Sequence, residues 1–345
     1  MKAVMKIARG EGNVEVRDVP EPHAGPRHVV LQVAAAGVCG TDIHIYRDDG
    51  GYAFNPPVVL GHETAGTVVE VGADVHRIKV GDRVTTETFY YTCGQCRFCR
   101  SGYPNLCPER KSIGSGVDGA MTKYVVVPEH NCHVLPEGVD LLAGSITEPL
   151  ACCVHGILER AGILPGDVVL VSGPGAIGQF CHQVAKSAGA TTIVCGVGGD
   201  EGRLELAREL GADHVLNVQT DDLRGLVRDL TDDRGVDVAV EAAGANTSLQ
   251  QCLDLVRKGG TLAQMGLYAR PVSFDMNLVP LKELKLTGSF SHVPSAWPRA
   301  LRLVAEGKVN SRRLITRQVP ITEWKSAFEA FNARTECKIV VTPVD

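Results

Sequence analysis

Four cysteines, Cys93, Cys96, Cys99 and Cys107, lie within fifteen residues of one another. Thiolates bind Zn²⁺ tetrahedrally at about 2.3 Å, and a short loop that carries four of them can enclose one ion. The alternative is a pair of disulfides in a secreted protein. However, the segment that begins at Met1 lacks the apolar core of a secretory signal. The spacing therefore predicts a structural zinc site, which is closed and supplies no chemistry of its own.

A second set of possible metal ligands is spread over the first half of the chain: Cys39, the adjacent pair His62 and Glu63, and Glu148. One thiolate, one imidazole and one or two carboxylates make a zinc shell with an open position for water or substrate. Each residue alone also has an ordinary explanation, since a lone cysteine usually packs as a small hydrophobe. Spacing alone leaves both interpretations open, a catalytic zinc site or unconnected core residues.

A glycine-rich turn, Gly173-Pro-Gly175-Ala176-Ile177-Gly178, follows an expected strand at 168–172 and opens an expected helix at 176–188. In the G-x-G-x-x-G pattern the first glycine permits the turn and the second admits a pyrophosphate. The third lets the helix pack closely on the strand. The helix N-terminus then offers free N–H groups to phosphate. The pattern and its context predict a dinucleotide-binding site.

The carboxylate that usually holds the ribose should end the second strand of such a unit. Here that strand ends at Gly196, and the acids Asp200 and Glu201 come several residues later. Either acid could loop back to the ribose. Equally, the space could admit a 2′-phosphate, with Arg203 as its partner. The choice between NAD and NADP therefore stays open.

Strand and helix patterns predict two regions that differ in secondary structure. Residues 1–147 are rich in short strands, at 29–34, 67–72 and after the turn at 80–84. Beyond residue 167 strands and helices alternate, which specifies a doubly wound parallel sheet. The strands are expected at 168–172, 192–195, 214–217, 236–241, 260–266 and 284–290, with helices at 176–188, 203–210, 222–230 and 248–256.

The end of the chain should add a helix at 297–306 and a last strand at 337–342 that pairs with the first lobe. We therefore expect one domain from residues 1–147 with 291–345, and a dinucleotide-binding domain from 148–290. A length of 345 residues suits two domains.

Composition excludes several classes of function. Hydrophobic residues make up 44% and charged residues 22%, which is typical of globular proteins. A net charge of -5 argues against a nucleic-acid partner. No apolar run approaches the roughly 20 residues of a membrane span. Twelve cysteines without a signal peptide indicate a reducing compartment, hence a cytoplasmic protein with a small-molecule substrate.

These pieces occur in an order that resembles the zinc-containing medium-chain dehydrogenase/reductase superfamily along nearly the whole chain. The matching segments are Gly37-Val-Cys39-Gly-Thr41-Asp-Ile-His44, Gly61-His62-Glu63, the four-cysteine lobe, Glu148-Pro-Leu and the Gly173 turn. Within that superfamily the chain is most similar to the sorbitol (polyol) dehydrogenase branch. The resemblance implies a GroES-like catalytic lobe, a Rossmann lobe and a dimer or homotetramer.

The resemblance also implies roles for individual residues. Cys39, His62 and Glu63 would ligate the catalytic zinc, with Glu148 a fourth ligand or the holder of the water on the zinc. Thr41 and His44 would relay the substrate proton outward through the nicotinamide ribose. The reaction would be oxidation of a secondary alcohol of a polyol to a ketone, with zinc as Lewis acid and NAD or NADP as hydride acceptor. The cofactor site would be completed by Ala242, Ala243, Met265, Gly266, Leu267, Ser289 and Phe290.

One segment departs from the polyol branch, which carries Phe-Arg-Tyr where this chain has Phe290-Ser291-His292. Because that arginine contacts substrate, sorbitol itself is in doubt, although Ser291 and His292 could still bind hydroxyls. Tyr46 is either a substrate-side tyrosine or a packed loop aromatic. Threonine or a cyclitol is the alternative substrate. A non-enzymatic zinc or nucleotide-binding protein is disfavoured because the catalytic set is complete.

Overall fold

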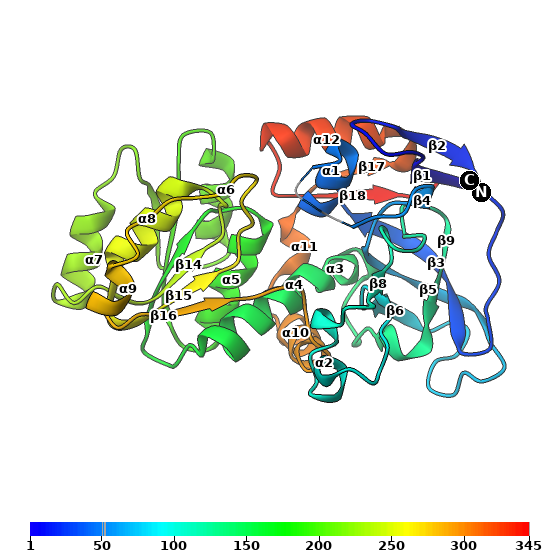
Figure 1. The fold of residues 1–345 in the computed structure, drawn as a ribbon, viewed down its shortest axis with the longest axis horizontal. Coiled ribbons are helices and arrows are strands. Elements are labelled where there is room, and N and C mark those ends of the chain that lie inside the picture. The colour runs from blue at the N-terminus through cyan, green and yellow to red at the C-terminus, as the bar shows by residue number, and fades with distance from the viewer. Residues whose placement is uncertain (50, 52, 345) are drawn as a thin grey trace. The chain divides into compact units, whose positions relative to one another are not determined.

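Two structural units divide the chain in a computed structural model that describes residues 1–49, 51 and 53–344 (Figure 1). The first unit comprises Met1–Glu148, Ser311–Ala333 and Lys338–Asp345, and the second comprises Pro149–Asn310 and Arg334–Cys337. The boundary near residue 148 lies within one residue of the expected one. The return to the first unit comes at Ser311, twenty residues later than we expected.

Contacts within the second unit explain why residues 291–310 belong to it. The Glu159 carboxylate accepts hydrogen bonds from Ser295 Oγ at 2.9 Å and from Arg299 at 3.3 Å. Trp297 is completely buried and donates its Nε1–H to His292. These residues hold helix α10 (Ala296–Ala305) to the second unit, whereas the sequence showed only that a helix was present.

A seven-stranded sheet forms the centre of the first unit, in the order β10-β6-β5-β3-β18-β17, with β9 also paired to β3. Its strands are β3 (His28–Gly37), β5 (Glu63–Val71), β6 (Arg83–Thr86), β9 (Tyr124–Pro128), β10 (Cys132–Val134), β17 (Ile315–Pro320) and β18 (Lys338–Thr342). The expected pairing of the last strand with the first lobe is confirmed, because Val340 lies opposite Gly37 in the antiparallel β18–β3 pair. Strand β17 was not predicted.

Smaller elements surround this sheet. Strands β1 (Lys2–Lys6), β2 (Val14–Asp18) and β4 (Val58–Val59) form one sheet, and β7 (Phe89–Tyr91) pairs with β8 (Lys111–Ser112). The helices are α1 (Gly40–Arg47), α2 (Arg97–Arg100), α3 (Leu141–Ser145), α11 (Ser311–Leu314) and α12 (Trp324–Ala333), while α4 (Thr147–Val154) begins in the first unit and continues into the second. Helix α1 follows directly from β3, and this connection places the Cys39 segment at the end of that strand.

A parallel six-stranded sheet, in the order β13-β12-β11-β14-β15-β16, confirms the doubly wound fold of the second unit. The strands are β11 (Val168–Ser172), β12 (Thr191–Gly196), β13 (His214–Asn217), β14 (Val236–Glu241), β15 (Val256–Gln264) and β16 (Lys285–Gly288). The helices are α5 (Ala176–Ser187), α6 (Glu201–Glu209), α7 (Leu223–Thr231), α8 (Asn246–Leu255), α9 (Leu278–Leu281) and α10. The chain order reverses between β11 and β14, so ligands are expected at the carboxyl ends of these strands.

Two details differ from the expected elements. Strand β15 begins at Val256, where we expected a helix to end, and it stops at Gln264 rather than at 266. A π-helix, His155–Ala161, continues α4 and was not predicted. It passes close to the sheet, because a Cβ on Gly156 would lie 2.3 Å from Met265 Sδ. Single-turn π geometry of this kind often accompanies functional sites.

The free energy of unfolding should depend on pH because of His182. This residue is buried in α5, and among the described residues its Nδ1 atom has no hydrogen-bond partner. Burial, together with the nearby Lys186 charge, lowers the pKa of His182 to about 4. Between that value and the ordinary value near 6.5, the unfolded chain binds a proton that the folded chain does not. We therefore expect the free energy of unfolding to fall by about 2 kcal/mol between pH 7 and pH 5 from this residue.

Thermal unfolding of the parent protein and a His182→Gln variant at both pH values measures this effect. The variant keeps a polar partner for Gln179, whose Oε1 lies 3.0 Å from His182 Nε2. It should lose less stability on acidification than the parent. An equal loss in both proteins would show that the acid sensitivity arises elsewhere.

Candidate metal centres and dinucleotide site

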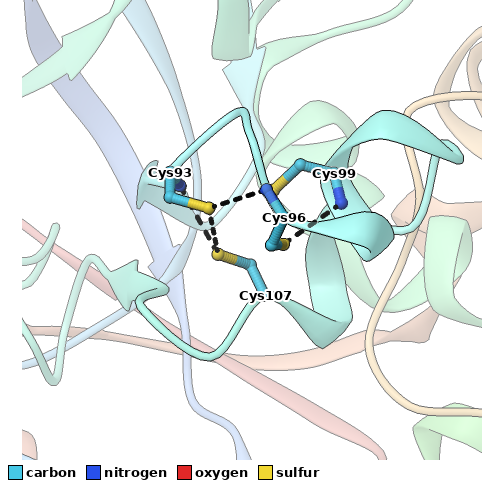
Figure 2. A group of neighbouring side chains, drawn as sticks. All are labelled: Cys93, Cys96, Cys99 and Cys107. Atoms are coloured by element: carbon cyan, nitrogen blue, oxygen red, sulfur yellow. Dashed lines mark hydrogen bonds between the residues drawn. The ribbon is translucent and has the colours of Figure 1, made fainter.

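The four cysteines of the predicted structural site converge as expected (Figure 2). Their sulfur atoms all lie within 4.8 Å of one another, and those of Cys93 and Cys107 are 3.6 Å apart. A tetrahedral ion with bonds of about 2.3 Å requires sulfur separations of about 3.8 Å, whereas a disulfide requires about 2.05 Å. All twelve cysteines are free thiols. The arrangement fits a zinc ion and excludes disulfides.

Backbone N–H groups of the lobe point at these sulfur atoms and favour thiolates. The N–H of Cys96 lies 3.3 Å from Cys93 Sγ, and that of Cys99 lies 3.5 Å from Cys96 Sγ. The backbone hydrogen bond from Cys99 lowers the pKa of Cys96 to about 7, whereas burial raises the pKa of Cys99 to about 12. Since metal binding requires deprotonated thiols, an ion that binds here must displace protons from the lobe.

Cys39, His62 and Glu63 form the second group whose ligand atoms all lie within 4.8 Å of one another. Cys39 stands at the start of α1, and the other two residues lead into β5. Gly37 makes room for the carboxylate, because a Cβ there would lie 2.1 Å from Glu63 Oε2. This convergence favours the metal-site interpretation that spacing alone left open.

Asp42 organises both His62 and Cys39, a role that we did not assign from the sequence. It is completely buried, and its Oδ2 accepts the Cys39 N–H at 2.9 Å. Its Oδ1 lies 3.8 Å from His62 Nδ1, which is too long for a hydrogen bond but close enough for its charge to favour a protonated ring.

Negative charge accumulates around His62. Although burial opposes the imidazolium, Cys39, Asp42 and Glu148 together raise the pKa of His62 well above its ordinary value. A thiol and carboxylates gathered around one histidine are a donor set that Zn²⁺ binds.

Lys338 is a second residue that sequence reasoning missed. Its Nζ donates to Glu63 Oε1 at 2.6 Å and to the carbonyl of Val38 at 2.9 Å. Burial opposes the ammonium, but Glu63 and the neighbouring thiol and carboxylate raise the pKa of Lys338. Glu63 Oε2 makes no hydrogen bond of good geometry, but it lies 2.6 Å from Lys338 Nζ, so the ammonium contacts both oxygens of the carboxylate.

Glu148 is a buried residue in the first turn of α4. Its charge raises the pKa of both His62 and Lys338, which places the carboxylate near the centre. It is not one of the three residues whose ligand atoms lie within 4.8 Å of one another. Its role as a fourth ligand or as the holder of the water on the zinc stays a prediction.

Thr41 and His44 lie one turn apart on α1, so they share a helix face. Thr41 Oγ1 is 3.8 Å from Cys39 Sγ. His44 Nδ1 lies 2.5 Å from Asp49 Oδ1, and both side chains are partly exposed. This contact holds Nδ1 of His44 against the Asp49 carboxylate. Asp49 was not predicted to take part.

The glycine-rich turn has the geometry that phosphate binding requires. A Cβ on Gly175 would meet no atom within 4 Å, so a ligand can approach the backbone there. A Cβ on Gly178 would lie 1.8 Å from the carbonyl oxygen of Gly173, which shows why the third glycine is needed. Gly175 is the N-cap of α5 and has no side-chain cap, so the first N–H groups, from Ala176 and Ile177 onward, remain available.

The remaining predicted cofactor residues lie at the carboxyl edge of the same sheet. Ala242 and Ala243 follow β14, and Met265, Gly266 and Leu267 follow β15. Ser289 and Phe290 follow β16; Phe290 and Leu267 are exposed. Ser289 Oγ is buried without a hydrogen-bond partner, an unsatisfied group that a bound ligand can satisfy. The arrangement fits a dinucleotide laid across β11, β14 and β15.

Arg203 is engaged by the protein rather than directed at a ligand. Its Nε and Nη2 donate to the carbonyl of Glu336 at 3.0 and 2.6 Å, and its Nη1 lies 3.4 Å from Asp200. Asp200 Oδ2 accepts the Val197 N–H at 3.2 Å, so this acid does loop back to the end of β12. Glu201 instead binds the N–H of Gly199.

The three predicted substrate residues have different surroundings. Tyr46 packs against Trp324 and Phe328 with ring centroids 6.0 and 5.9 Å away, which is the packed-aromatic alternative. His292 is completely buried and accepts the Trp297 Nε1–H at 3.0 Å, so its Nδ1 is occupied within the protein. Ser291 is half-buried with a φ of 57°, in the left-handed region. A substrate role for these residues stays a prediction.

Comparison with known proteins gives consistent matches. Residues 25–137 match the model of the alcohol dehydrogenase GroES-like domain, and residues 176–306 match that of zinc-binding dehydrogenase. The chain is 44% identical to a sorbitol dehydrogenase of Halalkalibacterium halodurans, covering 100% of both chains. It is 41% identical to a D-arabitol-phosphate dehydrogenase of Enterococcus avium, covering 99% of this chain and 97% of the other.

A solved structure with the same fold is a zinc-binding dehydrogenase from Sinorhizobium meliloti bound to NADP. It has a TM-score of 0.89 and 34% identity, with 99% of each chain covered. The fold expected from the sequence, a GroES-like unit with a Rossmann unit, is confirmed. Among the described residues no helix is long and apolar enough to cross a membrane.

Proposed function

Because the chain belongs to the zinc-binding dehydrogenases of the alcohol dehydrogenase family, we propose that it oxidises a secondary alcohol of a polyol to a ketone. The observation that carries the proposal is the convergence of Cys39, His62 and Glu63 in the first unit. The relatives at 44% and 41% identity are named for sorbitol and for D-arabitol phosphate. A polyhydroxy substrate is common to both.

Cys39, His62 and Glu63 would hold the zinc, which supplies a Lewis acid for the substrate hydroxyl, while the nicotinamide accepts the hydride. The buried Asp42 carboxylate, with Oδ1 3.8 Å from His62 Nδ1, places negative charge beside this ligand. Glu148, buried beside the centre, accepts a hydrogen bond from the hydroxyl or water and orients it. The proton is passed by Thr41 and received by His44, whose Nδ1 lies against the Asp49 carboxylate.

A substrate panel tests the proposal. Reduction of the nicotinamide is followed at saturating cofactor with sorbitol, arabitol, arabitol phosphate, a cyclitol, threonine and simple alcohols. A polyol or polyol phosphate should give the highest kcat/KM. Preference for threonine or a cyclitol would replace the polyol assignment, and exclusive activity on monohydroxy alcohols would overturn it.

The loop after β12 supports NAD as the preferred cofactor. Asp200 lies at the strand end where a ribose carboxylate is needed, and Arg203 is already bonded to Asp200 and to the Glu336 carbonyl. A 2′-phosphate would be repelled by the Asp200 carboxylate, and the Arg203 guanidinium that could bind it is already hydrogen-bonded within the protein. We therefore expect kcat/KM with NAD to exceed that with NADP by at least about tenfold, since a like-charge contact costs more than 1.4 kcal/mol.

Replacement of Asp200 by serine should reverse much of this preference, because it removes the repulsion and releases Arg203 Nη1. The ratio of kcat/KM for NADP to that for NAD should rise by about tenfold or more. Glu201→Ser is the matched control, since Glu201 binds only the exposed Gly199 N–H. An unchanged ratio in the Asp200→Ser variant would contradict the assignment.

The oligomeric state and compartment are also proposed. Strand β16 ends the order of the parallel sheet, and Leu286 on it and Leu281 before it are exposed. An exposed apolar edge strand supports assembly of the chain into a dimer or tetramer, which light scattering would measure. The twelve free thiols support a reducing, cytoplasmic location.

A further inference from the structure

A buried carboxylate without a cationic partner ends strand β14. Glu241 is completely buried, and in the described chain its side-chain hydrogen-bond donors are all neutral. Oε1 accepts the N–H groups of Ala243 and Gly244, both at 3.0 Å, and Oε2 accepts Gln264 Nε2 at 2.7 Å. Burying a carboxylate is costly unless it is hydrogen-bonded, so this arrangement is a specific feature of the site.

Hydrogen bonds of Glu241 connect the turn after β14 to the turn after β15. Gln264, the last residue of β15, donates from the same Nε2 to the carbonyl of Gly266 at 2.8 Å. The main-chain carbonyl of Glu241 accepts the N–H groups of Met265 and Gly266 at 2.9 and 2.8 Å. A Cβ on Gly266 would lie 2.5 Å from Glu241 Oε2, so the carboxylate sits directly against this turn.

The same two turns contact each other and the glycine-rich turn. A Cβ on Gly244 would lie 2.4 Å from the carbonyl oxygen of Leu267, and a Cβ on Gly173 would lie 2.7 Å from Ala243 N. The three turns at the carboxyl ends of β11, β14 and β15 therefore form one packed group. Glu241 is the charged residue at its centre.

Sheet topology relates this group to one end of a dinucleotide. On one side of β11 lie β12 and β13, and on the other lie β14, β15 and β16. Each half of such a sheet binds one mononucleotide. Since the Asp200 loop after β12 serves the adenosine ribose, the β14 half faces the nicotinamide. This step rests on the proposed function.

We propose that Glu241 is a positioning residue for the nicotinamide loops and that its charge favours the oxidised, cationic nicotinamide over the reduced, neutral one. Hydrogen bonds spread the carboxylate charge but do not cancel it, and the buried setting weakens screening by water. The protein would thus bind the oxidised cofactor more tightly, relative to the reduced cofactor, than a neutral residue would allow.

Dissociation constants of the zinc-loaded protein for NAD and NADH, measured by calorimetry, test the proposal. Glu241→Gln keeps the size of the side chain and one acceptor oxygen but removes the charge. It should weaken NAD binding relative to NADH binding on the order of tenfold, because one buried charge no longer attracts the cationic nicotinamide. Glu241→Asp should keep the wild-type ratio even if both affinities fall.

Gln264 provides a matched pair of variants that does not depend on the Glu241→Gln protein being folded. Gln264→Lys places an ammonium next to the carboxylate and should shift the ratio in the same direction as Glu241→Gln. Gln264→Met removes the amide tie but leaves the charge, so both cofactors should weaken together. Circular dichroism and zinc content confirm that each variant is folded.

An unchanged NAD to NADH ratio in Gln264→Lys, with both cofactors bound, would overturn the role of the charge and leave the proposed function standing. Equal ratios of the NAD and NADH dissociation constants in the Gln264→Lys and Gln264→Met proteins would also overturn the role of the charge. If the parent protein binds neither cofactor, the proposed function fails, and this inference fails with it.

Discussion

Replacement of Cys39 by alanine should abolish turnover while leaving the protein folded. The substitution removes one of the three ligands that converge at the catalytic centre, together with the thiolate charge near His62 and Lys338. Loss of a metal that contributes several kcal/mol to the transition state lowers kcat by about three orders of magnitude or more. Zinc content should fall from two ions per chain to one, because the four-cysteine site is unaffected.

Metal analysis and initial rates on the same preparation measure this effect. Cys132→Ala is the control, because Cys132 is a buried thiol of the first unit outside both metal groups. It should keep both ions and most of the activity. A Cys39→Ala protein that retains two zinc ions and wild-type turnover would contradict the assignment of the catalytic centre.

Replacement of Cys96 by serine should instead cause a large loss of thermal stability. Among residues 93–107 only Asn105 and Cys107 are buried, so the lobe has almost no hydrophobic core of its own. Structural zinc contributes about 10–16 kcal/mol to the folding free energy of isolated zinc-finger peptides. In this lobe the zinc must provide the stability that a hydrophobic core would otherwise give. We expect the unfolding temperature to fall on the order of 10 °C and the lobe to open.

Limited trypsin digestion, followed by mass spectrometry, should then detect cleavage after Arg97 and Arg100, which are protected when α2 is intact. Ser101→Ala is a matched control in the same lobe, since Ser101 Oγ donates only to the Arg97 and Phe98 carbonyls of α2. It should resist trypsin as the parent does. An intact, protease-resistant Cys96→Ser lobe with one zinc ion lost would show that the metal is not what holds it.

Local patterns made the metal and dinucleotide sites predictable. The thiol spacing of the Cys93 lobe and the strand–glycine–helix order around Gly173 both encode short-range geometry, and the structure realises both. The Rossmann strands were likewise evident, because each is a continuous apolar run such as Val168–Ser172. Strand β17 was missed because Arg317, Gln318 and Pro320 give it little strand character.

Long-range partners could not be read from the chain. Lys338 meets Glu63 only because β18 pairs with β3, which brings together residues 275 positions apart. His292 was predicted near substrate from the resemblance, and the sequence did not reveal its hydrogen bond with Trp297. Asp42 lies inside the Gly37–His44 motif and Asp49 follows it, but their roles depend on the direction of each side chain. Such contacts arise from tertiary packing that periodicity does not encode.

The central claim, a zinc-dependent polyol dehydrogenase, is tested most directly by the rate of nicotinamide reduction with a polyol before and after removal of metal. Chelated protein, verified to hold no zinc, should be inactive, and addition of Zn²⁺ should restore the rate together with two bound ions per chain. Full activity of the metal-free protein would contradict the account. So would a protein that binds two zinc ions and NAD yet oxidises no polyol.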